Sequence, residues 1–140
     1  MALPINNISH LIPQKTPFVM VDTLVDFTAE KVTSSFTILD NNLFVENATF
    51  LESGLIENMA QTVALHTGYN YFLKNEEAPV GYIGSIKKVA ILKLPTLNET
   101  ITTEATILHE FMGVTMVEVK AFNQNKEEIA SAEMKTVIAS

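Results

Sequence analysis

Glu57 is the residue of this chain whose type and surroundings point most directly to chemistry. Within the stretch Ser53–Leu73 it is the only formally charged side chain, although the chain holds 16 acidic and nine basic residues. Burying an ionised carboxylate costs free energy unless it is paired or hydrogen-bonded, and acids held in enclosed sites are candidates for proton transfer. The pattern alone equally allows a structural role, in which a helix dipole and the amide of Gln61 stabilise the carboxylate.

The spacing of small and polar residues predicts that Ser53–Leu73 is a helix. At about 100° per residue, Glu57 shares one face with Gln61, Ala64 and Gly68. An apolar stripe lies on another face, at Ile56, Met59 and Val63. A surface helix would carry several charges on its outer face, so we expect this one to be enclosed on most sides. Polar residues interrupt the stretch too often for a membrane span.

Two signals compete for the start of this helix. Thr49 with Glu52 fits a capping box, and Ser53 fits a simple N-cap. The helix is expected to end near residues 74–77, because Pro79 follows directly.

Alternation of apolar and polar residues on both sides of the helix predicts an antiparallel sheet. Strands are expected at Phe18–Phe27 and Lys31–Leu39, and then at Val80–Leu94, Thr100–Phe111, Val114–Phe122 and Ile129–Ile138. The last three are expected to form a meander. No alternating βα pattern supports a parallel sheet, so the predicted fold class is α+β: one domain over residues 1–140, with residues 1–17 as an N-terminal arm.

Composition excludes several classes of protein. A net charge of −7 argues against a nucleic-acid binder. All nine basic residues are lysines, so the chain offers no bidentate guanidinium for a phosphate or carboxylate. Without cysteine there is no disulfide and no thiolate nucleophile or metal ligand. The first 15 residues lack a signal-peptide pattern, so we expect a cytoplasmic protein with no membrane segment.

Four segments resemble, in order and spacing, the β-hydroxyacyl-acyl-carrier-protein dehydratases of fatty acid synthesis: Ile12-Pro13, Thr16–Asp22, Glu57–Gln61 and Gly81–Val89. The Glu57–Gln61 segment is also similar to dehydratases of polyene-type lipid synthesis. The resemblance implies a hotdog fold, in homodimers or trimers of dimers with active sites at the subunit interface. It implies 3-hydroxyacyl thioesters carried on the phosphopantetheine of an acyl carrier protein, with no metal and no cofactor of the enzyme's own.

In the family the acid at the Glu57 position works with a histidine from the loop before the helix. Here Asn47 occupies that position, and no histidine lies between His10 and His66. Removing water from a 3-hydroxyacyl thioester needs two positioned proton transfers. Glu57 can supply one, whereas the Asn47 amide can only take part in hydrogen bonds. Both are nevertheless the predicted catalytic residues.

Supporting roles are predicted for three other residues. Gln61 would hold Glu57, backbone N–H groups near Gly54 would polarise the thioester oxygen, and Glu46 would form a carboxylate pair with Glu57. A histidine from elsewhere is the alternative second group. His66 lies about 180° from Glu57 on the helix, so we expect a structural role for it, as for His109, while His10 cannot be placed.

Lys87, Lys88 and Lys93 form a basic island, because residues 78–98 contain no acid. The resemblance implies an acidic carrier protein, for which this island is a predicted docking surface acting by electrostatic steering. Solvated strand lysines are the simpler interpretation.

Three functions fit the sequence. The first is a dehydratase that uses Glu57 and a second group. The second is an acyl-thioester hydrolase of the same fold, in which Glu57 activates water without a histidine. The third is a non-catalytic subunit that binds acyl chains or pairs with an active paralogue.

Overall fold

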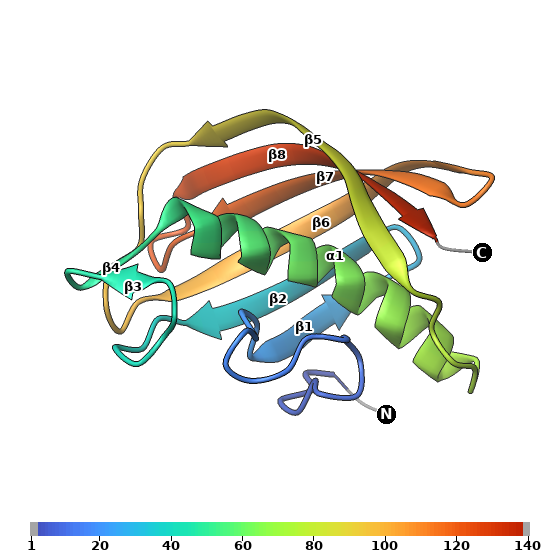
Figure 1. Ribbon diagram of the computed structural model, residues 1–140, viewed down its shortest axis with the longest axis horizontal. Coiled ribbons are helices and arrows are strands. Elements are labelled where there is room, and N and C mark those ends of the chain that lie inside the picture. Colours follow the sequence, from blue (N-terminus) through green and yellow to red (C-terminus); the bar gives the residue numbers. More distant parts are fainter. Residues whose placement is uncertain (1–2, 139–140) are drawn as a thin grey trace.

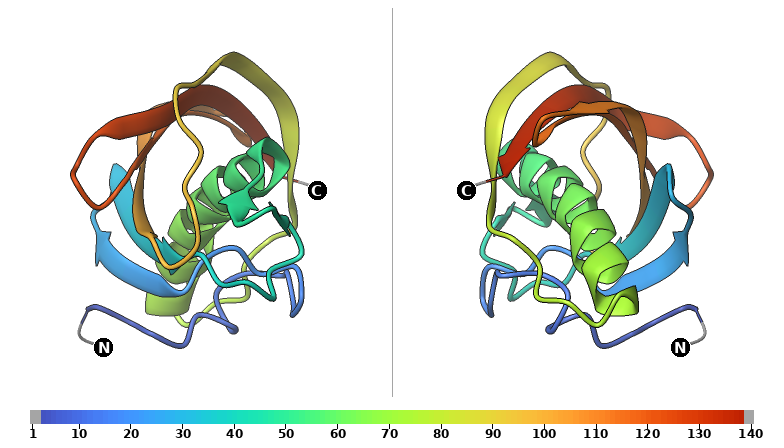
Figure 2. Two further views of the ribbon diagram at one scale, coloured as in Figure 1. Left: turned by 90° about the vertical axis from the view of Figure 1, so that its left-hand side faces the viewer. Right: turned by 90° about the vertical axis from the view of Figure 1, so that its right-hand side faces the viewer.

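A 22-residue helix, α1 (Glu52–Leu73), lies along the concave face of a six-stranded antiparallel sheet in the computed structural model of the chain, which describes residues 3–138 (Figure 1). The strand order is β1-β2-β6-β7-β8-β5. The strands are β1 (Thr23–Phe27), β2 (Lys31–Thr37), β5 (Gly81–Ile91), β6 (Thr100–Phe111), β7 (Val114–Phe122) and β8 (Glu128–Ile138). End-on views show the sheet curving around the helix (Figure 2). This is the predicted α+β hotdog architecture. No helix within the described range is long and apolar enough to cross a bilayer.

The first predicted strand is shorter than expected. The sequence predicts Phe18–Phe27, but β1 begins only at Thr23. The backbone from Phe18 to Met20 is instead bound by side chains of α1. Gln61 accepts a hydrogen bond from the Met20 N–H (2.6 Å) and donates one to the Phe18 carbonyl (2.8 Å). These groups therefore have partners outside the strand ladder.

The start of α1 differs from both capping predictions. Its N-cap is Leu51, which makes no side-chain capping bond. The turn is held instead by packing against a small hairpin that the sequence analysis missed, β3 (Val45–Glu46) and β4 (Thr49–Phe50). The Leu51 N–H donates to the Phe44 carbonyl (2.9 Å), and a Cβ at Gly54 would lie 2.5 Å from the Phe50 ring. Backbone and ring contacts thus replace a polar cap.

A buried polar network fixes α1 on the sheet. Asn58, which has no exposed surface, donates to the Met20 carbonyl (2.7 Å) and accepts from the Thr103 hydroxyl of β6 (2.7 Å). One turn later, the Thr62 hydroxyl lies 2.7 Å from that of Ser34 on β2. Such satisfied networks favour a single arrangement of helix and sheet, so they also fix the direction in which Glu57 points.

The two edges of the sheet are treated differently. At the β1 edge, Ile5 and Leu24 exchange two backbone hydrogen bonds of 2.9 Å, so the N-terminal arm covers part of this strand. The β5 edge has no such cover from the described chain, and Tyr82, Ile83 and Ile86 of this strand are exposed. An unpaired strand with exposed apolar side chains is a template for pairing with another chain.

Candidate active site

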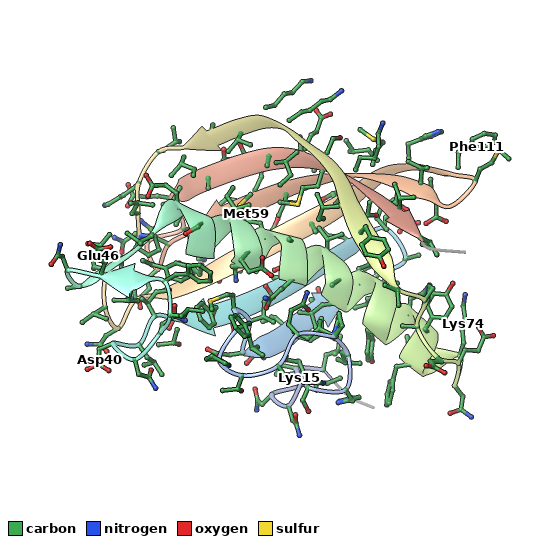
Figure 3. The ribbon with its side chains drawn as sticks, viewed as in Figure 1. Lys15, Asp40, Glu46, Met59, Lys74 and Phe111 are labelled. Carbon is green, nitrogen blue, oxygen red and sulfur yellow. The ribbon has the colours of Figure 1, made fainter. Side chains whose placement is uncertain are left out.

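A cavity of about 640 Å³ lies between α1, β5 and the inner face of the β6–β7 hairpin. Five residues of one helix face line it and are called the cavity strip below: Glu57, Ala60, Ala64, Thr67 and Tyr71. At 1.5 Å per residue, the cavity strip is about 21 Å long. Glu57 is the acid at one end, and the exposed side chains of Lys74, Tyr82, Phe111 and Met112 surround the other. The cavity therefore opens at the end remote from Glu57, where Lys74 and Phe111 are labelled (Figure 3).

Gln61 holds the Glu57 carboxylate in a defined orientation. The Gln61 Nε2 donates to Glu57 Oε2 (2.8 Å) and to the Phe18 carbonyl, while its Oε1 accepts from the Met20 N–H. Because a backbone N–H can only donate, the carboxamide cannot be reversed. Gln61 is fully buried, so its orientation is fixed by the fold. Glu57 Oε1 has no hydrogen-bond partner among the described residues.

Asn47 and Glu46 lie away from this carboxylate in the single chain. Asn47 and Ala48, with φ of 52° and 61°, form the left-handed turn between β3 and β4. Both predicted site residues are exposed, neither is among the described residues that line the cavity, and Glu46 is labelled at the opposite end of the molecule from Lys74 (Figure 3). Gly54 is buried in the first turn, whose N–H groups have no partner four residues earlier in the helix. The catalytic and supporting roles of these residues stay predictions.

His66 has the structural contacts expected of it. Its Nε2 lies 3.0 Å from the carbonyl oxygens of Thr28 and Ala29, and its ring stacks on Phe27 with centroids 4.9 Å apart. Carbonyls only accept, so Nε2 carries the proton. Although His66 borders the cavity, it lies nine residues beyond Glu57, on the opposite side of α1 and about 13 Å along its axis.

His10 and His109 are both exposed, and His10 packs edge-on against Phe72. Within the described chain, no histidine forms a hydrogen bond or an ion pair with Glu57.

The environment of His66 predicts a pH-dependent stability. Burial lowers the pKa of His66 from its ordinary value of 6.5, and the Thr28 and Ala29 carbonyls and the charge of Glu110 oppose this only in part. Below pH 6.5 the unfolded chain therefore takes up a proton more readily than the folded one, and the free energy of unfolding falls as the pH drops towards the folded-state pKa. We expect His66→Asn to reduce this slope in urea titrations, whereas His109→Asn keeps it. Equal slopes for wild type and His66→Asn would contradict the assignment.

The basic island has acidic neighbours in space. Lys88 forms an ion pair with Glu133 of β8 (3.1 Å). The pKa of Glu127 is lowered, first by its hydrogen bond with Asn123 and then by the charge of Lys93. Lys87 is exposed and forms no ion pair with a described acid. The docking role of the three lysines stays a prediction, and Lys87 is the one whose charge is not balanced by a nearby described acid.

Two sets of residues at the site are not predicted from the sequence. Asn58 adjoins Glu57 and anchors α1, and an amide in the middle of an otherwise enclosed helix was the signal for it. Tyr71, Lys74 and Tyr82 surround the open end of the cavity, and no local pattern marks them.

Known proteins resemble this chain in sequence pattern and in fold. A family model described as ApeP-like, ApeP dehydratase, matches residues 6–140. No curated protein sequence matches the chain. Solved structures of similar fold include the three described next, all at identities that show a shared fold alone.

The first is the dehydratase heterocomplex ApeI:P from Xenorhabdus doucetiae (TM-score 0.87, 14% identity, covering 100% of this chain and 93% of that chain). The second is a hypothetical thioesterase with coenzyme A from Streptococcus pneumoniae TIGR4 (TM-score 0.67, 13% identity, 84% of each chain). The third is smu.793 from Streptococcus mutans UA159 bound to acetyl CoA (TM-score 0.68, 16% identity, 92% and 96%). Because the family model covers nearly all of the sequence and the fold agrees with it, the chain belongs to the ApeP-like family of dehydratases.

Proposed function

We propose that this chain dehydrates 3-hydroxyacyl thioesters, with Glu57 performing one of the two proton transfers. In this elimination a C–H bond at C2 and the C–O bond at C3 break, a C=C bond forms, and the hydroxyl leaves as water. The observation that supports the proposal is the Glu57 carboxylate, held by Gln61 and facing a cavity, in a chain of a dehydratase family. A carrier-protein-borne substrate and a cytoplasmic location belong to the same proposal.

The second proton-transfer group is proposed to come from another hotdog subunit. Within the described chain no histidine forms a hydrogen bond or ion pair with Glu57, and the β5 edge is uncovered, whereas the arm bridges the β1 edge. The similar Xenorhabdus structure is a dehydratase heterocomplex, which favours a non-identical partner. A homodimer, with Asn47 and Glu46 of one copy near Glu57 of the other, is the alternative.

The test compares Ile86→Lys on β5 with Val25→Lys on β1, since both wild-type side chains are partly exposed, at 39% and 38%. A lysine on an edge strand opposes edge pairing. In the complex with the partner subunit, we expect Ile86→Lys to reduce the molecular mass in solution to that of a single chain and to abolish enoyl thioester formation, while Val25→Lys keeps the mass and activity of the wild type. If the Ile86→Lys protein keeps both, β5 is not the interface.

The function itself is tested by incubating the purified chain, alone and together with other hotdog subunits from its source, with a 3-hydroxyacyl carrier protein. Enoyl product that depends on Glu57 supports the dehydratase. Release of free thiol without enoyl product supports the hydrolase, which the fold shared with a thioesterase keeps as second candidate. Binding without turnover in every mixture supports the non-catalytic subunit.

A further inference from the structure

Met20 is held on both sides of its Cα by side chains of α1. Its N–H donates to Gln61 Oε1 (2.6 Å), and its carbonyl accepts from Asn58 Nδ2 (2.7 Å). Because β1 begins only at Thr23, neither group belongs to the strand ladder. Met20, Asn58 and Gln61 are fully buried, so the loss of either bond would leave a buried polar group unsatisfied. The position of the Met20 backbone therefore depends on these two side chains.

Asn58 is itself oriented from the sheet. Its Oδ1 accepts from the Thr103 hydroxyl of β6 (2.7 Å), while its Nδ2 faces the Met20 carbonyl. A carbonyl can only accept, so the Asn58 carboxamide cannot be reversed. Four hydrogen bonds thus run in series from the sheet to the acid. The five residues that they join are called the positioning network below: Thr103, Asn58, Met20, Gln61 and Glu57.

The last bond of the positioning network determines how the Glu57 carboxylate is presented. Gln61 Nε2 donates to Glu57 Oε2 (2.8 Å) only as long as the Met20 N–H keeps the Gln61 oxygen on the other side. If Met20 moved, the carboxamide could turn over and place its oxygen against the carboxylate, where two acceptors repel. A hydrogen bond to an ionised oxygen is about twice as strong as one to a neutral oxygen. The donor on Oε2 therefore leaves Oε1 as the oxygen that takes up or delivers the proton.

We propose that Asn58 is a positioning residue for proton transfer at Glu57, and that it acts through the Met20 backbone and the Gln61 carboxamide. The inference rests on the proposed function in taking Glu57 as a proton-transfer group. Neither Asn58 nor Thr103 belongs to the cavity strip or lines the cavity elsewhere, so changes at these two positions keep its described lining. A catalytic group that is misplaced by about 1 Å can lose about 10²-fold in rate. Loss of the positioning network is therefore expected to lower kcat much more than it raises KM.

The test compares the removal of two hydroxyls on neighbouring strands. Thr103→Val removes the hydroxyl that holds Asn58, and Ser34→Ala removes the one that bonds Thr62. Ser34 and Thr103 are register partners on β2 and β6, and both are buried, so each variant weakens the attachment of α1 at the same level of the sheet. Only Thr103 belongs to the positioning network, which makes Ser34→Ala the matched control.

The kinetic measurement uses a 3-hydroxyacyl carrier protein, in the complex that supports activity. Thr103→Val is expected to lower kcat about three- to tenfold, the value of one hydrogen bond, with KM within about twofold of the wild type. Asn58→Leu, which breaks two bonds of the positioning network, should lower kcat about 10²-fold. Ser34→Ala should keep both constants. If Asn58→Leu does not fold, the comparison of Thr103→Val with Ser34→Ala decides the question by itself.

Hydrogen exchange of the Gln61 side-chain amide, followed by NMR on the purified chain, needs no turnover. Its Nε2 protons are bound by Glu57 and by the Phe18 carbonyl, so they exchange with solvent when this part of the structure opens. We expect this exchange to be about three- to tenfold faster in Thr103→Val than in Ser34→Ala, with urea unfolding of both variants as the measure of their overall stability.

Equal exchange rates of the Gln61 amide in the two variants, or equal kcat values, would overturn the assignment, because a merely structural role predicts the same loss from either hydroxyl. Should the Gln61 amide respond as expected while no mixture forms enoyl product, the positioning of the Glu57 carboxylate by Asn58 stands and the dehydratase proposal fails.

Discussion

Glu57→Gln is expected to lower enoyl thioester formation by about 10²–10⁴-fold, the usual contribution of one positioned proton transfer. The amide cannot take up or deliver the proton, but its oxygen can still accept the bond from Gln61 Nε2 that the carboxylate accepts at 2.8 Å. The shape and hydrogen bonding of the site are therefore kept, and the variant should unfold at nearly the wild-type temperature. The measurement is initial rate with a 3-hydroxyacyl carrier protein, in the complex that supports activity.

The matched control for this variant is Glu118→Gln, which makes the same change on an exposed position of β7. It should keep the wild-type rate. A Glu57→Gln enzyme with a rate within about threefold of wild type would show that Glu57 has only the structural role that its hydrogen bond with Gln61 also allows. Loss of thiol release, rather than of enoyl formation, would assign Glu57 to hydrolysis.

Gly68→Ala is expected to cost about 3 kcal/mol or more of the free energy of unfolding, at the upper end of the range for overpacking. The added Cβ would lie 1.8 Å from the Leu11 carbonyl oxygen, and the clashing atom belongs to backbone that cannot rotate away. The arm must then lift from α1, which also disturbs the Phe18–Met20 segment bound by Gln61. Urea unfolding followed by circular dichroism measures the loss.

Gly81→Ala provides the comparison, because the nearest atom to its new Cβ is the Val137 carbonyl oxygen at an ordinary 3.8 Å. We expect its midpoint to stay near that of the wild type. If Gly68→Ala were as stable as Gly81→Ala, the close packing of the arm on the helix would be wrong.

The sequence predicts most of the fold because the period of the hydrophobic pattern and the length of each patterned segment are local properties of the chain. Strands β6 and β7 begin and end at the predicted residues, and the long enclosed helix is confirmed. The predicted element boundaries are wrong where contacts with residues distant in sequence determine the local structure. Phe18 to Met20 have strand-forming side chains, but Gln61, more than 40 residues away, binds their backbone. Leu51 caps the helix because the β3–β4 hairpin packs against it, which no cap signal encodes.

The candidate site, like the fold, can be predicted from the sequence only in part. Helical spacing alone predicts that Gln61 lies beside Glu57, and the 2.8 Å hydrogen bond is present. The cavity could not be predicted, since it depends on how β5 and the β6–β7 hairpin arch over the helix. Gln14 also lines the cavity, and no neighbour in sequence marks it, because it lies on the arm that packs against α1 at Gly68. Asn47, which the resemblance aligns with the family histidine, lies in an exposed turn and does not line the cavity within the described chain.

The difference between the two edges of the sheet limits how many further chains can pair with it. A sheet with two free edges can add further chains at both, as fibrils do, whereas here the two hydrogen bonds between Ile5 and Leu24 obstruct the β1 edge. Two subunits that paired through their β5 strands, as proposed, would use up the remaining free edge in a single contact. Assembly by the proposed route would stop at a pair, and the exposed apolar strand would then not act as an aggregation site.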